Sequence, residues 1–113
     1  MFIKQISVFI ENRHGRLEEF TTLLGENGID LIALSIADTT NFGILRAIVA
    51  DNERALGLVR DHGYTANLTE VLAVAVPDSP GGLAGVLTML RDGSISIEYL
   101  YSFVRRVGKD AII

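Results

Sequence analysis

Two short loops carry the residues of this chain whose types and spacing suit binding chemistry. Each loop follows an apolar run and precedes a helical pattern, in the stretches ENRHGRL and PDSPGGL. The start of a helix presents unpaired backbone N–H groups and a partial positive charge, which suit a carboxylate. Gly15 and Gly81 allow a ligand to approach the backbone closely, and Asn12 or Asp78 can accept hydrogen bonds from an ammonium group. An amino-acid zwitterion needs both features close together.

The same residues have a purely structural interpretation, which the sequence leaves open. Gly15 and Gly81 permit a tight turn from strand to helix, and Asn12 and Asp78 can satisfy neighbouring backbone groups.

Catalytic and metal sites are not predicted. The two histidines, His14 and His62, fall in different elements, which supports neither a metal site nor a histidine-activated nucleophile. Glu18 and Glu19 are adjacent on a helix and point apart, so they form no acid–base pair. The stretch GGLAG lacks the Lys-Ser/Thr of a phosphate-binding loop, and the chain has no cysteine. We therefore expect no enzymatic activity, no cofactor and no metal.

The two loops belong to an internal repeat. When the chain is shifted by 66 residues against itself, the register holds without a gap from residue 6 to residue 47. The identical pairs are Val8 and Val74, Gly15 and Gly81, Leu17 and Leu83, Thr22 and Thr88, Leu24 and Leu90, Ile29 and Ile95, and Leu34 and Leu100. The chain thus contains one unit and most of a second.

The first unit predicts the order strand, helix, strand, strand, helix, strand. The strands are expected at Ile3–Ile10, Ile29–Ala37, Ile44–Ala50 and Tyr64–Leu68, with one helix from Leu17 to about Gly28 and another from an Asp51 N-cap to about Gly63. This order is the split βαβ pattern. We predict an α+β, ferredoxin-like βαββαβ sandwich in tandem repeat, with antiparallel sheets and the helices on one face.

The second unit is predicted to be incomplete. Val71–Val76 reads as its first strand, a helix follows, and Ile97, Tyr99, Tyr101 and Phe103 alternate along one face of the next strand. The repeat stops at Ile113, within a third strand. We therefore expect a first domain at 1–68 and the front half of a second, βαββ only, at 69–113. We also expect the chain to be a portion of a longer protein.

An apolar sheet face without helices predicts oligomers. The strands are apolar on both faces, but this architecture covers only one with helices, and a second sheet commonly covers the other. We expect a homo-oligomer formed through sheet faces or edges, with Tyr99 and Tyr101 packed between sheets rather than serving as a stacking platform for a ligand.

Composition narrows the class of protein and its partners. The 113 residues are 49% hydrophobic, enough for a packed core, and carry a net charge of −4, which argues against nucleic acid as a partner. No apolar run approaches the roughly 20 residues needed to cross a bilayer, and the N-terminus has no cleavage site of a signal peptide. We expect a soluble cytoplasmic protein without a membrane partner.

The repeated stretches of this chain resemble the ACT domain family. The matching stretches are ENRHGRL with NGIDLIALSIA in the first unit and PDSPGGL with DGSISIEYLYSFV in the second, and together they span essentially the whole chain. The resemblance implies regulatory binding of an amino acid or related metabolite on behalf of enzymes of amino-acid metabolism. It places the ligand where two domains pair, near the loop between the first strand and first helix. By position, those loops are Asn12, Arg13, His14 and Gly15, and Asp78, Ser79, Pro80 and Gly81.

The loops differ, and Arg13-His14 is bulkier and more cationic than Ser79-Pro80, so we favour the second loop if only one binds. Three functions remain open: an amino-acid sensor that signals to a metabolic enzyme, an assembly module that binds no ligand, and, with least support, an enzyme on the same fold.

Overall fold

The first unit is a complete βαββαβ sandwich. The structure, a computed structural model, describes residues 1–11, 13–38, 42–105 and 107–113. The elements of this unit are β1 (Phe2–Glu11), α1 (Arg16–Glu26), β2 (Leu31–Asp38), β3 (Phe42–Val49), α2 (Asn52–Asp61) and β4 (Thr65–Leu72). The four strands form one antiparallel sheet in the order β2-β3-β1-β4. This confirms the predicted ferredoxin-like fold.

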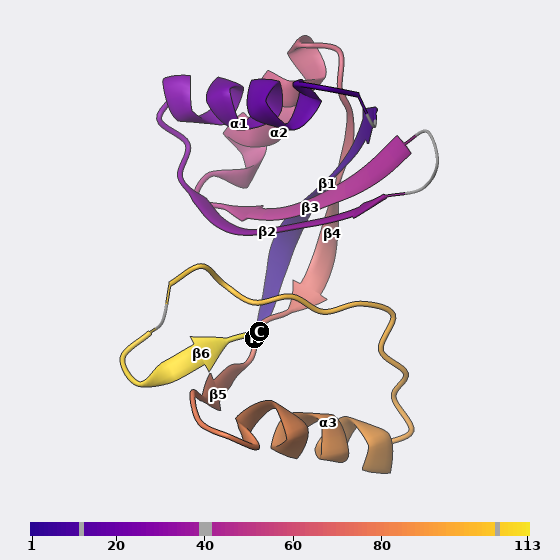
Figure 1. Cartoon of the computed structure of the whole chain (residues 1–113), viewed down its shortest axis with the longest axis vertical. Coiled ribbons are helices and arrows are strands. Elements are labelled where there is room, and N and C mark those ends of the chain that lie inside the picture. The colour runs from indigo at the N-terminus through magenta and orange to yellow at the C-terminus, as the bar shows by residue number, and fades with distance from the viewer. Residues whose placement is uncertain (12, 39–41, 106) are drawn as a thin grey trace.

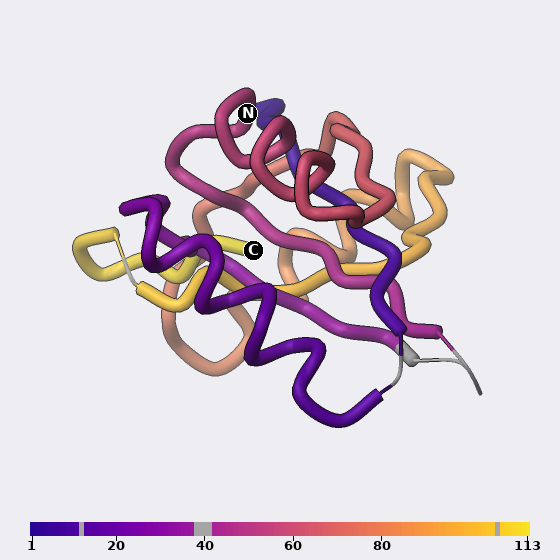
Figure 2. Tube along the Cα trace, turned by 90° about the horizontal axis from the view of Figure 1, so that it is seen from above, coloured from indigo at the N-terminus to yellow at the C-terminus, as the bar shows by residue number. Residues whose placement is uncertain are grey.

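The core lies between this sheet and its two helices. Alternate residues of β1, namely Ile6, Val8 and Ile10, are buried against Phe20 and Leu24 of α1. The helices α1 and α2 cover the same face of the sheet, and Figure 2 shows them from above. The alternation along the strands leaves Gln5, Ser7 and Phe9 facing the other side.

The second helix has the predicted start and end. The Asp51 side chain accepts a hydrogen bond from the backbone N–H of Arg54 at 3.2 Å, which confirms the N-cap. After the helix, Gly63 adopts a φ of 85°, a left-handed conformation that suits glycine.

The second unit comprises β5 (Ala75–Pro77), α3 (Gly82–Asp92) and β6 (Asp110–Ile112). Helix α3 begins and ends exactly one repeat, 66 positions, after α1. The end of each helix is also repeated: Ile29 N–H donates to Leu24 C=O at 3.0 Å, and Ile95 N–H donates to Leu90 C=O at 2.9 Å. The repeat seen in the sequence is therefore a repeat of backbone conformation.

The predicted strand Val71–Val76 is divided between two sheets. The chain belongs to β4 as far as Leu72 and to β5 from Ala75, with Ala73 and Val74 between them. Ala73 N–H donates to Met1 C=O at 2.8 Å, beside β1, whereas Val74 exchanges hydrogen bonds with Ile113, beside β6. The junction changes partners without a flexible linker, because each of its residues continues the hydrogen bonding of one sheet.

The strand expected over Ile97–Phe103 is absent from the described residues. Between α3 and β6 the chain is extended but irregular, and a single bridge joins Phe103 to Ala33 of β2. The prediction of a regular strand was wrong because Tyr99 and Tyr101 reach across to β1 instead of following a neighbouring strand.

The turn before β6 is longer than its counterpart in the first unit. Val8 pairs with Leu45, and the repeat-related Val74 exchanges hydrogen bonds with Ile113. Val74 lies 66 positions after Val8, but Ile113 lies 68 positions after Leu45. The gapless register predicted from the sequence therefore does not hold in the strand pairing beyond this turn, where the second unit has two additional residues.

Candidate functional site

The two candidate loops share one backbone conformation. Gly15 has φ 83° and ψ −7°, and Gly81 has φ 87° and ψ −6°, so both adopt the left-handed conformation that glycine allows. The hydrogen bonds also correspond. Arg13 N–H donates to Glu11 C=O at 2.8 Å and Ser79 N–H to Pro77 C=O at 2.9 Å. The described residues of the two loops thus form equivalent turns from strand to helix. Asn12 of the first loop lies outside the described residues.

Both turns leave a helix start without a side-chain cap among the described residues. At the start of α3, the N–H of Gly82 donates to Ser79 C=O at 3.0 Å, while the N–H groups of Leu83 and Ala84 have no acceptor within the described part of the chain. Such N–H groups, with the partial positive charge of the helix, suit an anion.

The electrostatic surroundings of the two helix starts differ. The first turn of α1 carries Glu18 and Glu19, whereas the first turn of α3 carries no acidic residue. In the first loop, Arg13 Nε forms an exposed ion pair with Glu11 Oε2 at 3.5 Å. Two carboxylates thus lie at the start of α1, where Glu19 pairs with Arg16 at 3.1 Å, and none lies in the first turn of α3.

The second loop also leaves no room for a side chain at the first residue of its helix, Gly82. A Cβ added to Gly82 would lie against the carbonyl oxygen of Pro77, closer than real atoms approach. The equivalent position in the first unit, Arg16, carries a full side chain whose guanidinium lies over the Tyr64 ring, 4.6 Å from its centroid. Asp78 N–H donates to Lys109 C=O at 3.4 Å, which joins this loop to the turn before β6.

The structure does not bring the two loops together within one chain. Arg13, His14 and Gly15 lie around a shallow, open depression at the start of α1 with Leu17, Glu18 and Thr21. Asp78, Ser79, Pro80 and Gly81 are exposed beside β5 and α3, toward the opposite end of the longest axis of the molecule (Figure 1).

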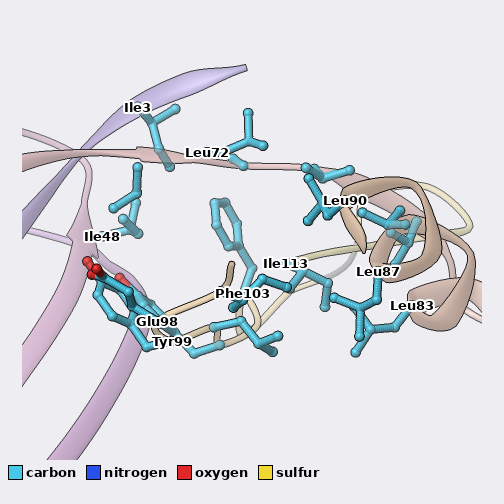
Figure 3. Close-up of a pocket in the computed structure, with 18 of the residues that line it drawn as sticks. Ile3, Ile48, Leu72, Leu83, Leu87, Leu90, Glu98, Tyr99, Phe103 and Ile113 are labelled. Atoms are coloured by element: carbon cyan, nitrogen blue, oxygen red, sulfur yellow. The ribbon is translucent and has the colours of Figure 1, made fainter. Parts of the chain in front are cut away.

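A second cavity, which the sequence analysis did not identify, lies between the two units. It has a volume of about 400 Å³ and contains none of the predicted ligand-binding residues in its wall. Figure 3 shows Leu83, Leu87 and Leu90 of α3 on one side and Ile3 and Ile48 of the first sheet on the other. Phe103 and Ile113 lie between these two sets.

Beside this cavity, a polar cluster holds the segment before β6 against the first sheet. Gln5 is fully buried, its Nε2 donates to Tyr99 Oη at 3.1 Å, and its Oε1 accepts from Tyr101 Oη at 2.6 Å. The Arg46 guanidinium lies 3.8 Å from the centroid of the Tyr99 ring. Burial, and then the neighbouring Tyr99, raise the pKa of Tyr101 to about 12, against a smaller opposing effect of Arg46.

Sequence reasoning missed the contribution of Gln5 and Arg46. The only local signal was the polar pair Gln5 and Ser7, on alternate positions of an otherwise apolar strand. Tyr99 and Tyr101 do not pack between two sheets as expected: they lie in an irregular segment and contact Gln5 of a single sheet in the same chain. No group of three acidic, histidine or cysteine residues that could hold a metal occurs within the described ranges. In the same part of the chain, no helix has the length and apolar character needed to span a membrane.

Comparison with known proteins places the chain in a family. The family model described as an ACT domain pair matches residues 1–113. The crystal structure of protein BT0572 from Bacteroides thetaiotaomicron is similar, with 42% sequence identity, a TM-score of 0.89, and coverage of 99% of this chain and 76% of that chain.

A second solved structure shares the fold. The regulatory subunit of aspartate kinase from Thermus thermophilus, in its ligand-free form, has a TM-score of 0.68 at 17% identity and covers 96% of this chain and 78% of its own. No functionally curated protein matches the chain. ACT domains are generally regulatory and bind small molecules. The chain belongs to the family of ACT domain pairs.

Proposed function

We propose that this chain is a regulatory protein that binds an amino acid at the loop formed by Asp78, Ser79, Pro80 and Gly81. The observation that carries the proposal is the match of the whole chain to the ACT domain pair, a family of regulatory, small-molecule-binding domains. We infer that the protein has no catalytic activity of its own and acts in the cytoplasm.

The geometry of the second loop supports this location. The amino acid's carboxylate is placed at the N–H groups of Leu83 and Ala84, where the α3 dipole favours negative charge and no acidic side chain opposes it. Its ammonium group is placed beside the Asp78 carboxylate. Gly81 keeps the approach to these N–H groups free of side-chain atoms.

The first loop is proposed to contribute to the site only when two copies of the protein assemble. Because Arg13, His14 and Gly15 lie far from the second loop in one chain, a ligand between two such loops requires a second copy of the protein. We therefore propose a homo-oligomer in which Asn12, Arg13, His14 and Gly15 of one copy face the second loop of another.

The proposed recipient of the signal is a metabolic enzyme. One solved neighbour of the same fold is itself a regulatory subunit of an enzyme, an aspartate kinase. At 17% identity this likeness concerns the fold, so the enzyme that this chain regulates is a separate experimental question.

A second function, assembly without a ligand, is favoured by one surface. On the sheet face opposite α1 and α2, Phe9 remains 52% exposed beside its cross-strand partner Ile44. Apolar residues at such a position suit the docking of another sheet.

A thermal-shift screen against the twenty amino acids tests the proposal. A ligand at about 100 times its Kd adds about 2.7 kcal/mol to stability, which shifts the Tm of a chain of this size by roughly 10 °C. We expect one amino acid to produce such a shift, which Asp78→Ala removes and which Asp61→Ala, at an exposed carboxylate outside both loops, leaves intact. If every amino acid leaves the Tm unchanged while the protein is oligomeric by light scattering, assembly without a ligand is the correct function.

A further inference from the structure

Arg46 of β3 is a half-buried cation without a carboxylate partner. It lies on the sheet face opposite α1 and α2, and its guanidinium forms neither a hydrogen bond nor an ion pair within the described ranges. Arg16, the other half-buried arginine of these ranges, pairs with Glu19 at 3.1 Å. A charge that is partly removed from water is costly without a partner, so an unpaired one suggests a site for an anion.

Tyr99 holds this guanidinium from one side. The Arg46 Cζ lies 3.8 Å from the centroid of the Tyr99 ring. The Tyr99 hydroxyl accepts a hydrogen bond from Nε2 of the fully buried Gln5 at 3.1 Å, so the ring cannot move away without breaking that bond. The cation is therefore held in place by an aromatic ring, while its five N–H donors have no acceptor in the described chain.

The residues beside Arg46 add donors and no negative charge. Ser7 of β1 and Ser35 of β2 are its direct cross-strand partners, and Asn67 of β4 comes next, opposite Ser7. Directly opposite residues have Cβ atoms about 5 Å apart, so one small ligand can reach several of them. The Ser7 hydroxyl accepts from Gln5 Nε2 at 3.0 Å, which leaves its own hydrogen to donate. This row across the sheet suits an anion.

The next row of the same sheet face is apolar. Ile44, two residues before Arg46 on β3, pairs with Phe9 of β1 on one side and with Ala37 of β2 on the other. The Phe9 side chain is 52% exposed. Residues two apart on one strand lie roughly 7 Å from each other, which is comparable to the length of a short apolar acid. A donor-rich row and an apolar row thus lie side by side.

We propose that the sheet face around Arg46 is a second ligand site, which binds a carboxylate that carries an apolar body and no ammonium group. The carboxylate accepts hydrogen bonds from the Arg46 guanidinium and the neighbouring serine hydroxyls, and the apolar body lies over Phe9 and Ile44. A planar guanidinium matches a carboxylate, and a single cation suits one negative charge better than the two of a phosphate.

The same rows argue against an amino acid at this site. Neither row contains an acidic residue, since Asn67 and Thr65 supply the β4 positions. Glu98, the neighbour of Tyr99 in the chain, is exposed and forms no ion pair with Arg46. An ammonium group beside the bound carboxylate would instead lie close to the guanidinium, which repels it. The proposal does not depend on amino-acid binding at the second loop.

Titration with 3-phenylpropanoate, followed through the backbone amide signals in NMR spectra, tests the proposal. We expect the amides of β1 and β3 beside Arg46 to shift, while those of residues 81–84 stay in place. Four related probes should each bind at least about tenfold more weakly. They are 3-phenylpropan-1-ol, which lacks the charge; acetate, which lacks the apolar body; L-phenylalanine, which adds an ammonium group; and inorganic phosphate.

Variants of the two rows assign the contacts. Arg46→Gln should raise the Kd for 3-phenylpropanoate at least about tenfold, because it removes hydrogen bonds from a charged donor. Arg46→Lys keeps the charge without the paired donors and should lose less. Arg54→Gln removes the same charge from an exposed position on α2 and should leave the Kd unchanged. Phe9→Thr should weaken 3-phenylpropanoate but not acetate.

Several results would overturn the proposal. They are no binding of 3-phenylpropanoate by the unaltered protein, an unchanged Kd in Arg46→Gln or in Phe9→Thr, and equal binding of the alcohol, L-phenylalanine or phosphate. If no probe binds and Arg46→Gln lowers the oligomer mass in light scattering, the guanidinium serves contact between copies instead. Asp78→Ala should bind 3-phenylpropanoate normally, so failure at this site and failure at the second loop are distinguishable.

Discussion

The hydroxyl of Tyr101 donates a 2.6 Å hydrogen bond to the side-chain oxygen of Gln5, a residue 96 positions earlier in the chain. The amide nitrogen of Gln5 donates in turn to Tyr99 Oη at 3.1 Å and to Ser7 Oγ at 3.0 Å. Both N–H groups and the oxygen of this buried amide are therefore used. A single side chain of β1 thus makes two of the hydrogen bonds that hold the second unit on the first sheet.

Replacement of Gln5 should loosen this attachment. In Gln5→Met the shape is retained, but two tyrosine hydroxyls lose their partner, and we expect a loss of about 1–3 kcal/mol in the free energy of unfolding. Urea denaturation measures it. Adding Tyr99→Phe and Tyr101→Phe to Gln5→Met removes the unpaired hydroxyls and should recover part of the loss. A triple variant no more stable than Gln5→Met would show that these hydrogen bonds do not account for the effect.

The same cluster should make stability fall at high pH. Burial raises the pKa of Tyr101 from 10.0 to about 12 in the folded protein, so the unfolded chain loses this proton first. Stability is therefore constant with respect to this group below pH 10 and declines from pH 10 toward 12. Denaturant midpoints measured across this range should fall less steeply in Tyr101→Phe. An identical decline in that variant would assign the pH dependence to other groups.

The ends of α1 and α3 offer a matched pair of substitutions. Gly28 follows α1 with φ 68°, and the equivalent Ser94 follows α3 with φ 58°, a conformation that costs a serine energy. We expect Ser94→Gly to raise the free energy of unfolding by about 0.5–1 kcal/mol, and therefore the Tm, and Gly28→Ser to lower both by a similar amount. Calorimetry on both variants measures this, and effects of the same sign would contradict it.

The start of α3 should tolerate no side chain at Gly82. A Cβ there would meet the carbonyl oxygen of Pro77, so Gly82→Ala must displace the loop and should cost about 1–3 kcal/mol. Gly85, one turn later, has open space around its position, so Gly85→Ala should stabilise α3 by about 0.5–1 kcal/mol. Thermal unfolding of the two variants should therefore shift in opposite directions. Equal shifts would mean that helix propensity, not the contact with Pro77, governs this site.

Much of the fold could be predicted from the sequence because it depends on local pattern. Apolar spacing located α1 and α3, and the repeat placed them at equivalent positions, since both follow a glycine that adopts a left-handed turn. The Asp51 cap was predictable for the same reason: its partner, Arg54, is three residues away.

The errors arise where distant contacts decide the conformation. The apolar run Val71–Val76 reads as one strand, yet its hydrogen bonds pass from Met1 to Ile113, at the two ends of the chain. Tyr99 and Tyr101 alternate as in a strand, but their partner Gln5 lies in another unit. The candidate loops were locatable from their glycines, whereas the effector and its contacts stay predictions, because the proposed site includes residues of a second copy.

The junction at Ala73 and Val74 has a mechanical consequence. One continuous stretch of backbone belongs to the β1–β4 pairing on one side and to the β5–β6 pairing on the other. It therefore couples the two sheets rigidly. A displacement of β5 would therefore pass through hydrogen-bonded backbone to β4 and the first sheet, to which Tyr99 and Tyr101 are held by Gln5.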